Sequence, residues 1–129
     1  MTSEDKTTLM ARTKTWRIDQ VITGSVGLIH GHGGVTALME YRPNTDPEAD
    51  APLPTTADIG HLSPWSVFVA RYDPDFTTWR VTPCNVEASA FVPEPTTMSE
   101  AEWVALLHRL RDATMSPGSS NVPQKGPSA

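Results

Sequence analysis

Apolar and polar residues alternate along the first patterned stretch of the chain, residues 15–23. Trp16, Ile18 and Ile22 fall on one face of this stretch, together with one glutamine. A period of two residues is typical of a strand that buries one face. The pattern therefore predicts a half-buried strand over 15–23, and the glycine and serine that follow it predict a turn.

A short apolar run at 26–30 and an alternating stretch at 35–42 come next, separated by a glycine-rich segment. Apolar residues occupy both faces of 35–42, as in a central strand, although the same spacing also fits a short helix. The flanking glycines and Pro43 favour a strand that pairs in a hairpin.

The second half of the chain resumes the strand pattern. Residues 66–72 are rich in strand-forming side chains, residues 77–83 alternate, and Pro74 stands at the second position of a turn between them. This arrangement predicts a β-hairpin over 66–83. Valine and alanine alternate with other residues at 86–92, which predicts one further strand.

The last patterned stretch predicts an amphipathic helix. Ser99 and Glu102 have the spacing of a capping box, which marks a helix N-terminus. One apolar stripe follows at helical spacing, formed by Trp103, Leu106, Leu107 and Leu110. The basic residues at 109 and 111 and the proline at 117 predict that the helix ends near 113–114.

Three stretches lack such patterning. Residues 43–65 contain five prolines and four acidic residues but no basic residue, so we expect a solvated acidic loop there. The polar ends, residues 1–13 and 115–129, predict disordered tails, and Met10 is an alternative start to Met1.

Together these elements predict one α+β domain over residues 14–114. We expect an antiparallel β-sheet of five or six strands, one C-terminal amphipathic helix packed on one face, and disordered termini. A chain of roughly 100 ordered residues buries one modest core.

Charge and residue content narrow the class of protein. The net charge is −5 and the pI about 5.2, which disfavours nucleic-acid binding through bulk electrostatics. Cys84 is the sole cysteine, so neither an internal disulfide nor a cysteine zinc cluster is expected. The first residues lack the apolar run of a signal peptide, and no stretch is long and apolar enough to span a bilayer. We expect a cytoplasmic protein, or a virion component if it is virus-structural, with no cofactor.

His30 and His32 stand in the glycine-rich segment between two predicted strands. In a strand both imidazoles would point the same way, and His61 and Asp58 are the available further ligands for a zinc or copper ion. The interleaved glycines also suit a tight hairpin turn, in which exposed histidines need no ligand. We interpret the segment as a turn and keep the metal site as the alternative.

Aromatic and basic residues supply the candidate interface. Trp65 follows a proline at the exit of the acidic loop, and Arg71, Tyr72 and Arg80 share the predicted hairpin. Exposed aromatic residues with arginine are the usual anchors of a protein interface. These four residues are therefore the predicted contact residues for a partner.

The sequence contains no motif that is specific for a reaction. We therefore expect a non-enzymatic interaction protein of the accessory, inhibitory, immunity or virus-structural kind. It would bind a protein partner or itself through a sheet face, an edge strand or the acidic loop. The alternative is a small metal-dependent or ligand-binding enzyme that uses His30, His32 and His61. A third hypothesis is a regulator that contacts nucleic acid through Arg17, Arg71 and Arg80.

Overall fold

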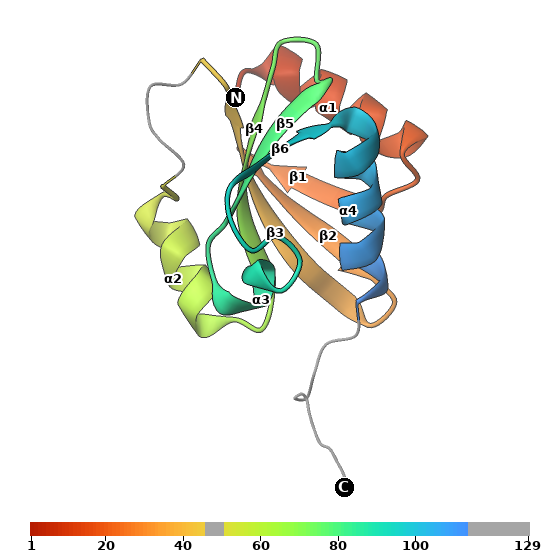
Figure 1. Cartoon of the computed structure of the whole chain (residues 1–129). Coiled ribbons are helices and arrows are strands. Elements are labelled where there is room, and N and C mark those ends of the chain that lie inside the picture. Colours follow the sequence, from red (N-terminus) through yellow and green to blue (C-terminus); the bar gives the residue numbers. More distant parts are fainter. Residues whose placement is uncertain (46–50, 114–129) are drawn as a thin grey trace, which may run out of the picture.

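The computed structural model describes residues 1–45 and 51–113, which form a six-stranded mixed sheet flanked by helices (Figure 1). The strands lie in the sheet in chain order: β1 (Gln20–Thr23), β2 (Val26–Gly31), β3 (Gly34–Pro43), β4 (Ser66–Tyr72), β5 (Thr78–Pro83) and β6 (Thr96–Ser99). The helices are α1 (Ser3–Thr15), α2 (Pro54–Leu62), α3 (Val86–Ser89) and α4 (Glu100–Asp112). The predicted α+β class is confirmed, and the tail expected at 115–129 lies outside the described residues.

One strand pair departs from the predicted antiparallel sheet, because β3 and β4 run parallel. A parallel pair cannot be closed by a tight turn and needs a crossover of about a dozen residues or more. The proline-rich acidic stretch supplies that crossover, and its second half forms α2 rather than a continuous loop. Pro54 is well suited to the first turn of α2. Proline lacks a backbone N–H, and an N–H at this position would have no hydrogen-bond partner within the helix.

The main core lies on one face of the sheet, which we call the inner face. Alternate residues of the strands point to this face, and α1, α3 and α4 cover it. The largest side chains buried there include Trp79, Trp103, Tyr41, Phe68 and Leu107. Helix α2 packs on the opposite, outer face over β4, and Figure 1 shows α2 and α4 on opposite sides of the sheet.

The local signals for the hairpins and for the C-terminal helix are confirmed. The predicted 66–83 hairpin is β4 and β5, which pair antiparallel. Helix α4 begins after a complete capping box, in which Ser99 Oγ accepts from the Glu102 N–H and Glu102 accepts from the Ser99 N–H. The four residues of its predicted apolar stripe are all buried.

The expected disorder of residues 1–13 is wrong, because this stretch belongs to α1. Thr2 caps the helix by accepting a hydrogen bond from the Asp5 N–H at 3.0 Å. Leu9 and Thr13 are the buried residues of α1, one turn apart, so the helix shows almost no hydrophobic periodicity. Its packing against the inner face, rather than its pattern, therefore stabilises it.

The predicted strand over 15–23 is confirmed only in its second half. Trp16 caps the C-terminus of α1, and Arg17 then takes a left-handed conformation with φ 61°. Strand β1 itself begins only at Gln20. Trp16 and Ile18 still reach the core, at 7% and 6% exposure. The prediction that they are buried is therefore confirmed, although the prediction that they lie in a strand is wrong.

The strand predicted at 86–92 is also wrong, because the segment opens with the short helix α3. Asn85 caps it by accepting from the Ala88 N–H at 2.9 Å. Ala88 and Val92, four residues apart, are buried, whereas Val86 is 84% exposed. The buried positions thus have helical spacing, and alanine favours a helix over a strand.

Asn85 joins three segments through its side-chain amide. The oxygen also accepts from the Val67 N–H at 3.2 Å, and the nitrogen donates to the carbonyls of Gly60 at 3.1 Å and Trp65 at 2.8 Å. The end of α2, the start of β4 and the start of α3 therefore depend on one side chain.

Replacement of Asn85 by alanine is expected to lower the free energy of unfolding by about 2–3 kcal/mol, since a helix cap and several backbone partners are lost together. Urea unfolding followed by circular dichroism measures this loss. Asn44→Ala, at an exposed turn position, is the matched control and should change stability by less than about 0.5 kcal/mol. Equal losses in the two variants would contradict the role given to Asn85.

Candidate protein-binding site

Strand β1 forms one outer edge of the sheet, with β2 as its neighbour in the described structure. The carbonyl of Asp19 accepts from the His30 N–H at 2.9 Å, in line with the β1–β2 register. Because hydrogen bonding alternates along an antiparallel pair, Val21 and Thr23 direct their backbone groups to β2. Gln20 and Ile22 therefore direct their N–H and C=O groups away from the sheet.

This edge strand is short, with four residues, but it lacks several other features with which proteins usually block strand addition. Residues 20–23 contain no charged residue and no proline, and their pairing with β2 shows no bulge. Val21 points to the outer face and is 49% exposed. The edge therefore offers both unblocked backbone groups and apolar surface to an added strand.

A cavity of about 200 Å³ lies beside the edge on the inner face, between α1 and the chain that enters β1. Its lining comprises Met10, Thr13, Lys14, Ile18, Asp19 and Gln20. Met10 is 46% exposed. The volume is below the 300–1,000 Å³ of sites that enclose drug-sized ligands, and it suits a single side chain of a peptide.

Gln20 holds the floor of this cavity in place. Its amide nitrogen donates to Thr13 Oγ1 at 3.3 Å, and its amide oxygen accepts from the hydroxyl of Tyr41 in a short hydrogen bond. Burial raises the pKa of the Tyr41 phenol well above its ordinary value, and the hydrogen bond to Gln20 offsets this in part. Tyr41 is therefore a neutral donor throughout the physiological range.

Gly27 makes this connection across the sheet possible. It lies opposite Ile22 in the β1–β2 register, directly beneath the side chain of Gln20. A Cβ atom at Gly27 would overlap Gln20 Oε1 and crowd the ring of Tyr41. The absence of a side chain therefore lets Gln20 cross β2 and reach β3.

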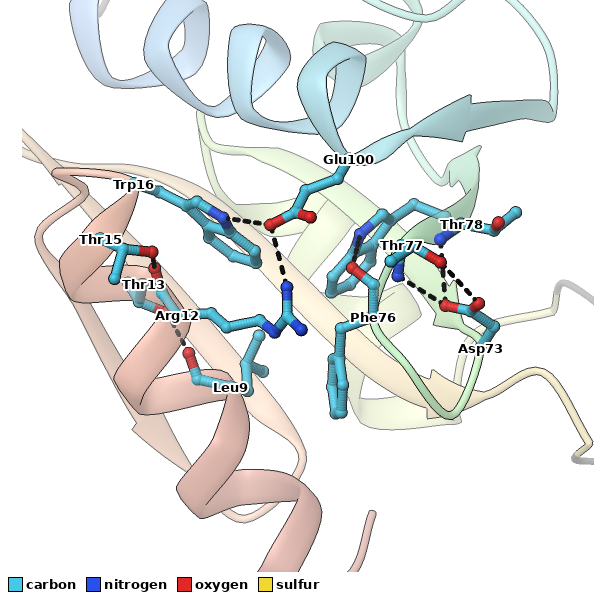
Figure 2. Close-up of polar contacts among 11 residues, drawn as sticks. Leu9, Arg12, Thr13, Thr15, Trp16, Asp73, Phe76, Thr77, Thr78 and Glu100 are labelled. Atoms are coloured by element: carbon cyan, nitrogen blue, oxygen red, sulfur yellow. Dashed lines mark hydrogen bonds and ion pairs between the residues drawn. The ribbon is translucent and has the colours of Figure 1, made fainter.

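Polar contacts with Glu100 hold the C-terminal half of α1 in place, as Figure 2 shows. The carboxylate of Glu100, at the start of α4, accepts from Trp16 Nε1 at 2.9 Å and pairs with Arg12 at 3.1 Å. The Arg12 guanidinium also lies 5.9 Å from the centre of the Phe76 ring, in the β4–β5 turn. The wall of the cavity is therefore held by α4 and by the sheet, although each contact is partly exposed and individually weak.

The glycine-rich histidine segment is the turn of the β2–β3 hairpin, as interpreted from the sequence. Gly31 pairs with Gly34, and His32 lies exposed in the turn between them. His30 and His32 line a cavity of about 390 Å³ with Arg111 and Asp112 at the end of α4. His61 instead lies exposed on α2. Among residues 1–45 and 51–113, no three side chains of the metal-ligating types gather around a common point.

The four predicted contact residues do not form one patch. Arg71 and Arg80 lie opposite one another on β4 and β5, and both line a cavity on the outer face. Tyr72 points to the inner face, is 2% exposed and donates to Asp5 Oδ2 at 2.8 Å, so its assignment to an exposed patch is wrong. Trp65 is half-buried and precedes β4, at the opposite end of that strand from Arg71.

Sequence reasoning missed the edge site because it treated the stretch that contains Met10 as disordered. The charges at the two ends of α1 were the available signal: Glu4 and Asp5 in the first turn, Arg12 and Lys14 in the last. This distribution complements the helix dipole and is typical of a formed helix.

Comparison of the chain with protein-family models, with curated proteins and with solved structures gives no match. None of the helices in residues 1–45 and 51–113 has both the length and the apolar composition of a membrane span. The geometry of the β1 edge is therefore the basis for a functional assignment.

Proposed function

We propose that this chain is a non-enzymatic interaction protein that binds an extended strand along the open edge of β1. The observation that carries the proposal is an uncharged edge flanked by accessible apolar side chains on both faces, Val21 on the outer face and Met10 on the inner. Strand addition uses backbone hydrogen bonds for affinity and pockets for alternate side chains for specificity. The backbone groups of Gln20 and Ile22 would supply the hydrogen bonds. The cavity between α1 and β1, which lies beside them, would supply the pocket for a side chain.

A second copy of the chain is the partner that fits this edge. In an antiparallel pair centred on Val21, Gln20 of each copy lies opposite Ile22 of the other, and Val21 faces its own counterpart. Directly opposed residues in this register include no pair of like charges: Asp19 meets Thr23. Val21 then occupies a position with closely spaced side chains, which buries the apolar surface that the single chain exposes.

Size-exclusion chromatography with light scattering, over a range of protein concentrations, tests the proposal. The wild-type chain is expected to elute as a dimer at high concentration. Val21→Lys is expected to raise the dissociation constant by about tenfold or more, since it places two like charges opposite each other at the centre of the interface. Far-UV circular dichroism checks that the variant remains folded.

Val86→Lys is the matched control, because it introduces the same charge at another exposed valine, on α3. It is expected to leave the dimer intact. A monomeric wild-type chain at the highest concentration would contradict the proposal. If Val86→Lys dissociated the dimer and Val21→Lys did not, the interface would lie at the α2–α3 end of the molecule instead.

We further propose that the protein acts as an accessory, inhibitory, immunity or virus-structural component, in the cytoplasm or in a virion. A single thiol, Cys84, supports a reducing compartment over one in which small domains are held by disulfides. Strand addition is also the kind of contact that assembly and inhibition use.

A further inference from the structure

We propose that the α1–β1 cavity selects an aliphatic side chain of the added strand, and that Ile22 of a second copy fills it. This inference rests on the proposed pairing of β1 with a second copy, and it names the side chain that gives the pairing its specificity. Strand addition takes its specificity from pockets that receive alternate side chains of the added strand. In a two-fold pair each copy supplies one such side chain and one cavity to the other.

Gln20 and Ile22 lie on the inner face of the sheet, on the same side as the cavity. Gln20 contacts the hydroxyl of Tyr41, which belongs to the core of that face. Ile22 is partly buried and packs against the same core. Side chains alternate along a strand, so the residue between them, Val21, points to the outer face. Both inner-face positions of β1 therefore face the cavity side of an added strand.

The register of the proposed pair brings Ile22 of the second copy to the cavity. Gln20 and Ile22 direct their backbone groups away from β2, so in a pair centred on Val21 they form the hydrogen-bonded positions across the interface. Gln20 lines the cavity together with Ile18, two residues earlier in the chain. Ile22 of the second copy thus lies directly opposite one lining residue and diagonally toward another.

The apolar part of the lining favours an aliphatic side chain. Met10 and Ile18 supply this surface, and Met10 is 46% exposed in the single chain. Its burial against an aliphatic side chain stabilises the pair in proportion to the apolar area removed from water. Lys14 and Asp19 also line the cavity, but both are exposed, so their charged groups can stay in water when the cavity is filled.

The uncharged polar groups of the lining already take part in hydrogen bonds within the chain. Thr13 Oγ1 donates to the Leu9 carbonyl at 2.6 Å and accepts from Gln20 Nε2 at 3.3 Å. The amide oxygen of Gln20 accepts from the Tyr41 hydroxyl. A polar side chain in the cavity competes with these bonds, whereas an aliphatic side chain leaves them intact. The volume of about 200 Å³ also suits one side chain of this kind.

Methyl NMR of a mixed dimer tests the contact directly. One preparation of the full chain is deuterated except at its methionine methyl groups, and the other except at its isoleucine methyl groups. The two are mixed at a concentration at which light scattering shows a dimer. We expect a nuclear Overhauser effect between the methyl groups of Met10 and Ile22. This effect can arise only between copies, because no single chain carries both sets of protons.

The contribution of Ile22 to affinity is measured by light scattering over a range of protein concentrations. Ile22→Ala is expected to raise the dimer dissociation constant by about tenfold or more, because the substitution empties both cavities of the pair. Val104→Ala is the matched control, since Val104 is also partly buried against the core but belongs to α4. It should leave the dissociation constant unchanged, and far-UV circular dichroism checks that both variants remain folded.

The cavity side of the contact is tested with Met10→Ala, which is also expected to weaken the dimer. The variant with both Met10→Ala and Ile22→Ala should weaken it by less than the product of the two separate factors, because both substitutions act on one contact.

Two results would overturn this inference and leave the pairing of β1 intact. One is a dimer without the Overhauser effect between Met10 and Ile22. The other is a dimer that Val21→Lys dissociates but that Ile22→Ala weakens no more than Val104→Ala does. A chain that stays monomeric at the highest concentration would instead overturn both this inference and the proposed pairing.

Discussion

Replacement of Trp79 by alanine is expected to lower the free energy of unfolding by about 3–5 kcal/mol, the range for large aromatic residues removed from a core. Trp79 is fully buried and stacks on Trp103 of α4, with ring centres 4.6 Å apart and an interplanar angle of 8°. Its edge contacts include Trp16 at 5.9 Å and Tyr41 at 6.2 Å, and its Nε1 donates to the Phe76 carbonyl at 3.1 Å. The side chain thus links α1, α4, β3 and the β4–β5 turn.

A loss of this size is a large fraction of the 5–15 kcal/mol that stabilises a typical domain. Urea unfolding must be followed by far-UV circular dichroism, because Trp79 contributes to the fluorescence signal. Trp65→Ala is the control, since Trp65 is half-buried and its carbonyl bond to Asn85 survives the substitution. We expect that control to lose about 1 kcal/mol or less. Comparable losses would show that Trp79 is not central to the core.

The second large effect is expected at the buried ion pair of the outer face. Glu40 is fully buried, and its carboxylate accepts from Arg42 Nε at 2.7 Å and from the Leu53 N–H at 3.0 Å. Arg42→Met should lower the free energy of unfolding by about 3–5 kcal/mol, because it removes the guanidinium partner of a buried carboxylate. Urea denaturation at neutral pH measures the loss.

A double-mutant cycle distinguishes the ion pair from simple packing. The variant with both Glu40→Met and Arg42→Met is expected to recover most of the stability lost by Arg42→Met, because apolar residues can replace a buried pair at little cost. Additive losses in the double variant would contradict this explanation. They would instead assign the role of Arg42 to the packing of its side chain.

The predicted contact residues and the candidate site show which features the sequence pattern can predict and which it cannot. The opposition of Arg71 and Arg80 was within reach of the sequence, because a hairpin with a short turn brings both strands into register. Tyr72 was misplaced because neighbouring residues of a strand point to opposite faces, so it cannot share an exposed surface with Arg71. The α1–β1 cavity was out of reach, since it requires a helix whose burial rests mainly on Leu9.

Local sequence signals are sufficient for the elements whose determinants lie within a few residues of one another. The Ser99–Glu102 box defines the start of α4, and the turn around Pro74 closes the hairpin of β4 and β5. The interleaved glycines at 31–34 make the β2–β3 turn. Each signal acts through neighbouring backbone groups, so no distant residue is needed to produce it.

Other elements depend on remote partners and could not be predicted from local signals. Helix α1 is held by Glu100 and the sheet, residues 86–89 form α3 under the cap of Asn85, and β4 joins β3 in parallel through α2. Local preference is weak at these places, and burial against another element outweighs it. The open edge of β1 likewise exists only because the assembled sheet ends there.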